Sequence, residues 1–274
     1  MTTTTTTTTT QTRRTPTAPF EQATGHPAVT HRPADARFRT EIGWLHSQHS
    51  FAFGAHDHPG NRGYRALRVI NDDVVEPGQG FGEHPHRDME ILTWVLDGGL
   101  KHGDSLGNLQ VLKPGELQAM TAGTGIRHSE FNASETDAVH FLQIWLMPRA
   151  AGAEPRYLQQ SFDAAGRSNR WQTLAIDDTR QAEAPEAMPI AQDASLSVAD
   201  VDAGASVTVT VAPGRHGYVH LATGAAKATT ADGSVDQPLA AGDALAVDNT
   251  ASEKPIELTL AASTAAQALW FDLA

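Results

Sequence analysis

The 274-residue chain contains no cysteine, which excludes disulfide scaffolds, thiolate metal sites and cysteine nucleophiles. No apolar run approaches the roughly 18 residues that a membrane span needs, and the first residues lack the apolar core of a signal peptide. Basic residues are also few, 20 Lys and Arg against 32 Asp and Glu, so the net charge of -12 would repel a phosphate backbone. We therefore expect a cytoplasmic protein without direct nucleic-acid or membrane contacts, in which histidines and carboxylates hold any metal.

Length and composition favour two domains, since 274 residues with 40% hydrophobic side chains allow two cores. Residues 1–24 begin with nine consecutive threonines after Met1 and are of low complexity, which predicts a disordered tail. We expect residues 25–150 to form a metal-binding N-terminal domain. Residues 151–274 are expected to form a linker and a C-terminal domain without a metal site.

Short apolar or alternating segments separated by turn residues follow Trp44. Examples are residues 50–53, 65–70, 91–96, 139–146 and 206–211. No segment of helical length keeps a 3.6-residue period. The pattern predicts an all-β protein in which the first domain is a small barrel or sandwich.

The two halves also resemble each other. Residues 92–98 align with 218–224, and the Gly-containing turn at 113–116 aligns with 240–243 at nearly the same separation. This similarity predicts a duplicated β-barrel. The same alignment places Thr210 and Ala212 where the first half has His84 and His86, and so predicts that the second barrel has no metal site.

Two pairs of potential metal ligands lie in the first half. Alternate residues of a strand share a face, so His84 and His86 should point the same way, as should His128 and Glu130. If the pairs meet, three imidazoles and one carboxylate suit a divalent transition metal. If that metal prefers octahedral geometry, two positions stay open for substrate and dioxygen. Glu90 shares the face of the first pair, so on this reasoning either Glu90 or Glu130 completes the site.

Other histidines are more consistent with packing or surface positions. His56 and His58 are followed directly by a Pro-Gly-Asn turn, which favours a mobile loop. His46, His49 and His102 are isolated in the sequence, so we expect them at the surface or in packing contacts.

The longest motifs resemble a known family. The residues that resemble the two cupin motifs are Gly78, His84, His86 and Glu90, then Gly115, Gly123, His128 and Asn132. The segments HPHRDMEI and MTAGTGIRHSEFN, with LRVINDDVV before and QIWLMP after, resemble pirins over about residues 32–162, specifically bacterial members with quercetin 2,3-dioxygenase activity. The resemblance implies a bicupin, two jelly-roll β-barrels packed together. It also implies one metal, in the N-terminal barrel, and favours Glu130 over Glu90 beside His84, His86 and His128.

The function implied by the resemblance is a metal-dependent dioxygenase that cleaves quercetin or a related flavonol or enolic aromatic with O2. Glu130 would take the proton from the enolic hydroxyl. We expect one divalent transition metal, with Fe(II) as the first choice. Ligands of this type also accept Mn, Co, Ni, Cu or Zn. The alternative is a non-enzymatic, iron-binding redox-sensing regulator that contacts a transcription factor or metabolic enzyme. The residues expected to form a planar pocket wall are Leu92, Trp94, Met120, Phe141 and Ile144.

Overall fold

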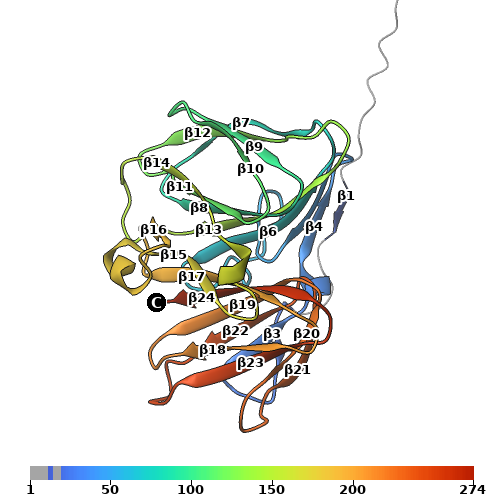
Figure 1. Ribbon diagram of the computed structural model, residues 1–274, viewed down its shortest axis with the longest axis vertical. Helices are drawn as coiled ribbons and strands as arrows, with labels where there is room; N and C mark the ends of the chain where they lie inside the picture. Colours follow the sequence, from blue (N-terminus) through green and yellow to red (C-terminus); the bar gives the residue numbers. More distant parts are fainter. Residues whose placement is uncertain (1–11, 15–19) are drawn as a thin grey trace, which may run out of the picture.

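The computed structural model describes residues 12–14 and 20–274. It contains two β-barrels stacked one above the other (Figure 1), each built from one eight-stranded and one four-stranded sheet. The helical segments of the described residues are three short 3-10 turns, η1 (Ala34–Ala36), η2 (Ala164–Gly166) and η3 (Asp178–Glu183). The predicted all-β, bicupin architecture is confirmed.

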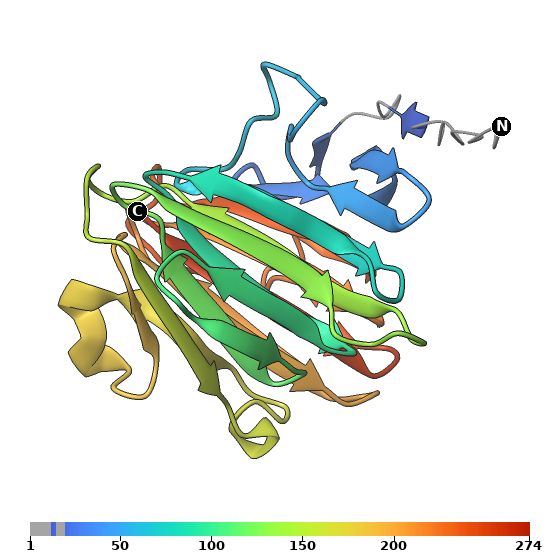
Figure 2. The same cartoon turned by 90° about the horizontal axis from the view of Figure 1, so that it is seen from above.

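The first barrel pairs a large sheet with a small one. The strands of its large sheet, in order, are β1 (Thr12–Arg14), β4 (Phe38–Glu41), β5 (Leu45–His49), β6 (Leu67–Val75), β13 (Val139–Leu146), β8 (Glu90–Asp97), β11 (Glu116–Thr121) and β14 (Arg156–Ser161). Its small sheet has the order β10 (Leu109–Leu112), β9 (Leu100–Asp104), β12 (Ile126–Asn132) and β7 (Gly80–His86). Figure 2 shows β7, β12 and β9 side by side on the outer side of this barrel.

The second barrel repeats the arrangement. The strands of its large sheet are β16 (Met188–Ile190), β15 (Gln172–Asp177), β17 (Ala194–Val201), β24 (Ala266–Leu273), β19 (His216–Thr223), β22 (Ala244–Asp248), β3 (Val29–Arg32) and β2 (Gln22–Ala23). Its small sheet has the order β18 (Ser206–Val211), β23 (Ile256–Ala262), β20 (Ala225–Thr229) and β21 (Asp236–Ala240).

The strand orders confirm the predicted duplication. The run β6-β13-β8-β11 in the first large sheet matches β17-β24-β19-β22 in the second, and β7-β12-β9-β10 matches β18-β23-β20-β21. Strands β8 and β19 carry most of the aligned segments 92–98 and 218–224. Each position in one barrel therefore has an identifiable counterpart in the other.

The N-terminal segment crosses between the barrels. Part of the predicted disordered tail is ordered, because residues 12–14 form β1 and the ring of Phe20 lies 5.0 Å from that of Phe38. The rest of that tail, residues 1–11 and 15–19, lies outside the described residues. Strand β3 pairs with β22 of the second barrel, whereas β14 pairs with β11 of the first. The sheets thus do not follow the predicted division into 25–150 and 151–274.

A shared apolar core holds the barrels together. Trp94 and Leu142 from the first large sheet pack in one buried cluster with Tyr218 and Phe271 from the second. Each such side chain contributes about 1.5–3 kcal/mol on full burial. The Trp94 indole also donates a hydrogen bond to Gln267 Oε1 at 2.7 Å. The outer face of each large sheet is therefore a packing surface for the other barrel.

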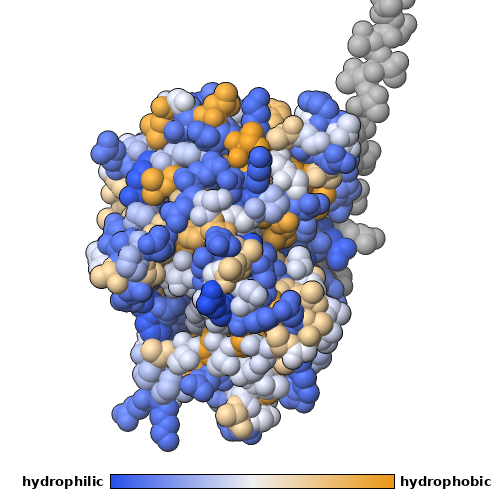
Figure 3. All heavy atoms as spheres, in the orientation of Figure 1, coloured by the Kyte–Doolittle hydropathy of each residue, from blue (hydrophilic) through white to orange (hydrophobic). Residues whose placement is uncertain are grey.

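The outer surface is largely polar. Hydrophilic residues cover most of the face in Figure 3, and hydrophobic ones occur there in small separate groups. Over the part of the chain that the structure describes, no helix has the length and hydropathy to cross a membrane.

Candidate metal centre

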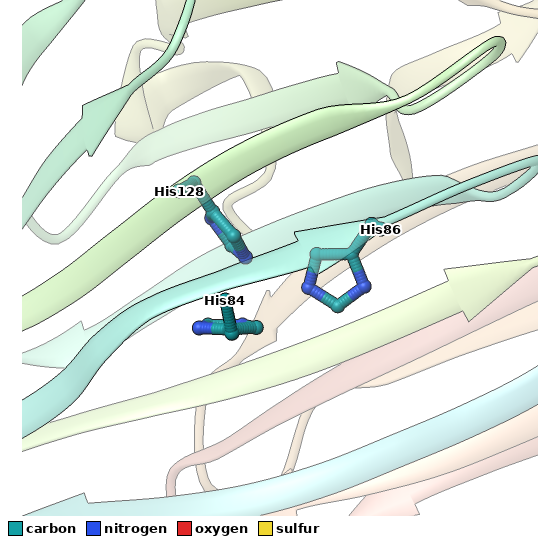
Figure 4. A group of neighbouring side chains, drawn as sticks. All are labelled: His84, His86 and His128. Carbon is teal, nitrogen blue, oxygen red and sulfur yellow. The ribbon is translucent and has the colours of Figure 1, made fainter.

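Strands β7 and β12 bring the two predicted ligand pairs together. They are antiparallel neighbours in which His84 lies opposite His128, and a bulge follows so that Glu130 lies opposite Phe81. The rings of the three histidines converge from these two strands (Figure 4). Their centroids are 4.4 Å apart for His84 and His128, 4.8 Å for His84 and His86, and 4.7 Å for His86 and His128.

Possible ligand atoms form two overlapping groups. One nitrogen each of His84, His86 and His128 lie within 4.8 Å of one another. Atoms of His102, His128 and Glu130 form a second group within the same limit, so His128 belongs to both. Each group is small enough for a single cation to draw its atoms together.

His102 makes the expected packing contact, a stack on Tyr157, but it is not isolated. It lies on β9 directly opposite Glu130 of β12, is 0% exposed, and faces the cluster. The sequence contained one usable signal, because His102 and Asp104 alternate on a strand like the two ligand pairs.

The imidazoles of the cluster are neutral and have ring nitrogens that can bind a metal. His84 Nδ1 donates a hydrogen bond to the carbonyl oxygen of Gly82 at 2.8 Å, which leaves its Nε2 as the acceptor. Burial lowers the pKa of His86 to about 4, with His84 adding to the effect, and burial with the surrounding imidazoles lowers that of His128 to about 2. Among the described residues, neither nitrogen of buried His128 has a hydrogen-bond partner. Neutral imidazoles with unsatisfied nitrogens fit a divalent transition metal.

Glu130 is a buried carboxyl held by an amide. Gln143 Nε2 donates to both carboxyl oxygens at 2.7 Å. Burial raises the pKa of Glu130 to about 8, against the lowering effect of Gln143, and the nearby Asp73 carboxyl raises it further. Burial also raises the pKa of Asp73 to about 7. A cation in this cluster would offset both penalties, which again fits a metal site.

A cavity of about 370 Å³, including its open mouth, lies above the cluster. Phe53, Phe81 and Trp145 supply its apolar walls, and Asn71 and Asp73 line it among the polar groups.

The predicted pocket wall was wrong. Leu92, Trp94 and Ile144 belong to the core between the barrels, and Phe141 and Met120 to two smaller buried clusters. Strand β8 is buried on both faces from Glu90 to Val95, so its apolar residues do not reveal which face meets the cavity.

Glu90 lies apart from the cluster. Glu90 accepts a hydrogen bond from Thr121 Oγ1 at 3.0 Å, and burial raises its pKa. Neither of the two groups of possible metal-ligand atoms in the described part of the chain includes it.

The remaining histidines have other contacts. The rings of His56 and His58 lie 5.2 Å from Phe38 and 4.7 Å from Phe20. The other two are engaged as well: His46 pairs with Glu41, and His49 Nδ1 donates to Asn71 Oδ1 at 2.8 Å. His49 therefore supports a residue of the cavity wall.

The corresponding positions in the second barrel are apolar. Val209 of β18 lies opposite Leu258 of β23, as His84 lies opposite His128. The predicted counterparts, Thr210 and Ala212, were one residue out of register: Thr210 is exposed and not buried in the barrel interior, and Ala212 lies beyond β18. A slip of one residue moves every side chain to the other face of a strand. The buried residues at the positions of the five clustered side chains are Val209, Val211, Ala228, Leu258 and Leu260.

Comparison with known proteins agrees with this architecture. Residues 31–146 match the family model described as Pirin, and residues 180–273 match that of the quercetinase C-terminal cupin domain. An Escherichia coli K12 protein named quercetin 2,3-dioxygenase is 56% identical over 133 residues, 48% of this chain and 58% of that protein. The chain thus spans little more than half the length of that relative. A pirin-like protein of Caulobacter vibrioides is 38% identical over 72% of this chain and 83% of that protein.

Solved structures give the same result. YhhW of Escherichia coli superposes with a TM-score of 0.78 at 37% identity, covering 90% of this chain and 97% of that one. A structure of the bacterial pirin YhhW in complex with nickel(II) gives a TM-score of 0.76 at 36% identity, covering 89% and 98%. Two family models match the chain, and the Caulobacter relative is 38% identical over 72% of it, so the chain belongs to the pirin family.

Proposed function

We propose that this protein is a metal-dependent dioxygenase that opens quercetin or a related flavonol or enolic aromatic with dioxygen. The observation that carries the proposal is the convergence of His84, His86 and His128, with Glu130 grouped beside His128, at a cavity walled by aromatic rings. The family match and the quercetin 2,3-dioxygenase name of the Escherichia coli relative support the reaction class.

We propose that these four side chains hold one divalent transition metal. Fe(II) is our first choice; Mn, Co, Ni, Cu and Zn suit the same donors, and the existence of a nickel(II) complex of YhhW supports a divalent metal. When bound, the metal supplies Lewis-acid activation of the substrate and dioxygen.

The cavity walls bind and orient the substrate. The Trp145 ring meets that of His86 edge-on at a centroid distance of 4.8 Å, and Phe53 packs edge-on against Trp145 at 5.4 Å. A flat aromatic ring gains favourable contacts among such rings and displaces water from the cavity.

Glu130 moves the proton. Its oxygens lie in the cavity lining, and a carboxylate there accepts the proton of an enolic hydroxyl before dioxygen adds to the ring. Gln143 orients this carboxylate. The Gln143 amide is in turn held by Thr93, whose hydroxyl donates to Gln143 Oε1 at 3.4 Å and accepts from Gln118 Nε2 at 3.2 Å.

His102 acts as a positioning residue. Its Nε2 donates to Asp104 Oδ2 at 3.0 Å, and its ring stacks on Tyr157 at 4.6 Å. Asn108 Nδ2 donates to the same carboxylate at 2.9 Å. These contacts hold the imidazole behind His128 and Glu130, the place from which supporting groups orient metal ligands.

The test is dioxygen uptake by iron-loaded protein incubated with quercetin. The Glu130→Gln variant should lose turnover while retaining metal, measured by elemental analysis. Full activity in that variant would exclude the role of Glu130. No uptake with iron, manganese, cobalt, nickel or copper would reject the enzyme and favour the redox-sensing regulator.

A further inference from the structure

The second barrel has a cavity of its own, about 880 Å³ including its open mouth. Strands β17 and β24 line it, as β6 and β13 line the cavity above the metal cluster. Trp270 of β24 pairs with Ser197 of β17, as Gln143 of β13 pairs with Asn71 of β6. The two cavities therefore share equivalent walls in the two large sheets, whereas the exposed side chains Thr208 and Thr210 of β18 line only the second one.

Trp270 closes the floor of this second cavity. It occupies the position of Gln143, is 7% exposed, and packs with Val209 in the interior core of the second barrel. The ring lies against Gly217, where a Cβ would collide with it. The indole therefore fits only because residue 217 is a glycine. Since the indole fills the barrel interior, the cavity is confined to the barrel mouth.

The charged wall of the cavity is internally balanced. Arg215 forms two hydrogen bonds with Asp272, at 3.0 and 2.9 Å, and contacts Asp193 at 2.9 Å. Arg180 contacts both aspartates at 3.3 Å and also pairs with the exposed Glu183, which does not line the cavity. A charged ligand would have to compete with one of these ion pairs, so the wall favours a neutral ligand.

The rest of the lining combines indoles with hydroxyl groups. Trp171 Nε1 donates to the carbonyl oxygen of Thr208 at 3.0 Å, which fixes the indole at the rim. The hydroxyl-bearing side chains of the lining are Thr173, Ser195, Ser197, Thr208 and Thr210. An aromatic face binds the flat side of a ring, whereas hydroxyls, arginines and aspartates hydrogen-bond groups at its edge.

We propose that the mouth of the second barrel binds a neutral six-membered ring that carries several hydroxyl groups. This second ligand site goes beyond the proposed dioxygenase activity and does not require the metal. The ring can be saturated, as in a cyclitol or sugar, or aromatic, as in a phenol. Both present a flat face and hydroxylated edges, and separate probes distinguish them.

The experiment titrates metal-free, full-length protein with myo-inositol, D-glucose and phloroglucinol, followed by calorimetry and saturation-transfer NMR. At least one probe should bind saturably. Trp171→Ala should weaken binding about tenfold or more, as expected for the loss of a stacking platform. Ser206→Ala is the matched control, because Ser206 is exposed on β18 and lies outside the cavity.

A second variant tests the site independently in case Trp171→Ala does not fold. Thr210 is exposed on β18, so Thr210→Trp should block the mouth and abolish binding, whereas Thr210→Ser should retain it. Binding should also persist in a His84→Ala, His86→Ala double variant. The proposal is overturned if no probe binds, if Trp171→Ala and Thr210→Trp both bind normally, or if the double variant loses binding. The titration does not depend on dioxygen uptake, so the ligand site and the dioxygenase activity can fail independently.

Discussion

The metal-free protein should become less stable as the pH rises from about 4.5 to about 8. Glu130 should be a main cause, and Asp73, whose raised pKa acts in the same direction, remains in both proteins compared below. Burial raises the pKa of this carboxyl from 4.5 to about 8 in the folded state. The folded protein therefore holds a proton in this range that the unfolded chain has released, so stability is present below the unfolded value and is lost as pH rises. At 1.36 kcal/mol per pH unit, the loss approaches roughly 5 kcal/mol by pH 8, with water penetration reducing it.

Such a loss is a large part of the 5–15 kcal/mol that holds a typical domain folded. The assay is urea unfolding of chelator-treated protein at pH 5 and pH 8, comparing wild type with Glu130→Gln. The variant cannot ionise at this position, so at pH 8 it should be the more stable protein by a few kcal/mol. Near pH 5 the two should differ little.

The lowered pKa values of His86 and His128 act in the opposite direction, because the unfolded chain binds their protons first as pH falls below about 6.5. They remain in both proteins and cancel in the comparison. Glu253→Gln, which changes an exposed carboxylate of the second barrel, is the control. Parallel pH profiles for wild type and Glu130→Gln would refute the reasoning.

Three further changes test other parts of the structure. His102→Phe keeps a ring against Tyr157 but loses the hydrogen bond to Asp104, so metal affinity, measured by chelator competition, should fall about 10–100-fold; unchanged affinity would remove His102 from the site. Trp145→Ala opens the cavity wall and should raise KM for a flat substrate with little change in metal content; an unchanged KM would place the substrate elsewhere. Leu142→Ala in the core between the barrels should cost about 2–5 kcal/mol in urea unfolding, and a loss below 1 kcal/mol would mean that this contact contributes little.

Alternation along the strands made much of the fold predictable. The segments 92–98 and 218–224 fall on equivalent strands β8 and β19, as their similarity predicted. The error at β18 was avoidable, because Val207, Val209 and Val211 alternate with Ser and Thr and so mark the buried face. The alignment of the two halves instead paired Thr210 and Ala212, which are not on that buried face, with His84 and His86.

Long-range pairing limited the prediction of the site. His102 joins the cluster because β9 lies beside β12 in a register that places it opposite Glu130. Nothing in the local sequence fixes that register, since the two strands are joined through β10 and β11. The walls Phe53 and Phe81 lie in segments whose approach to the cavity also depends on tertiary structure.

The duplication lets one barrel hold a polar interior that a single small domain would support poorly. At its ligand positions the first barrel buries imidazole nitrogens that have no partner among the described residues, and beside them two carboxyls with raised pKa values; the second barrel has valines and leucines at the corresponding positions. Each unsatisfied buried group costs about 1–3 kcal/mol. Removing the metal should therefore loosen β7 and β12 before β18 and β23, although all four belong to matching small sheets. Hydrogen exchange of the metal-free protein measures this directly: equal protection of the two pairs would mean that the core between the barrels, and not the cluster, sets the local stability.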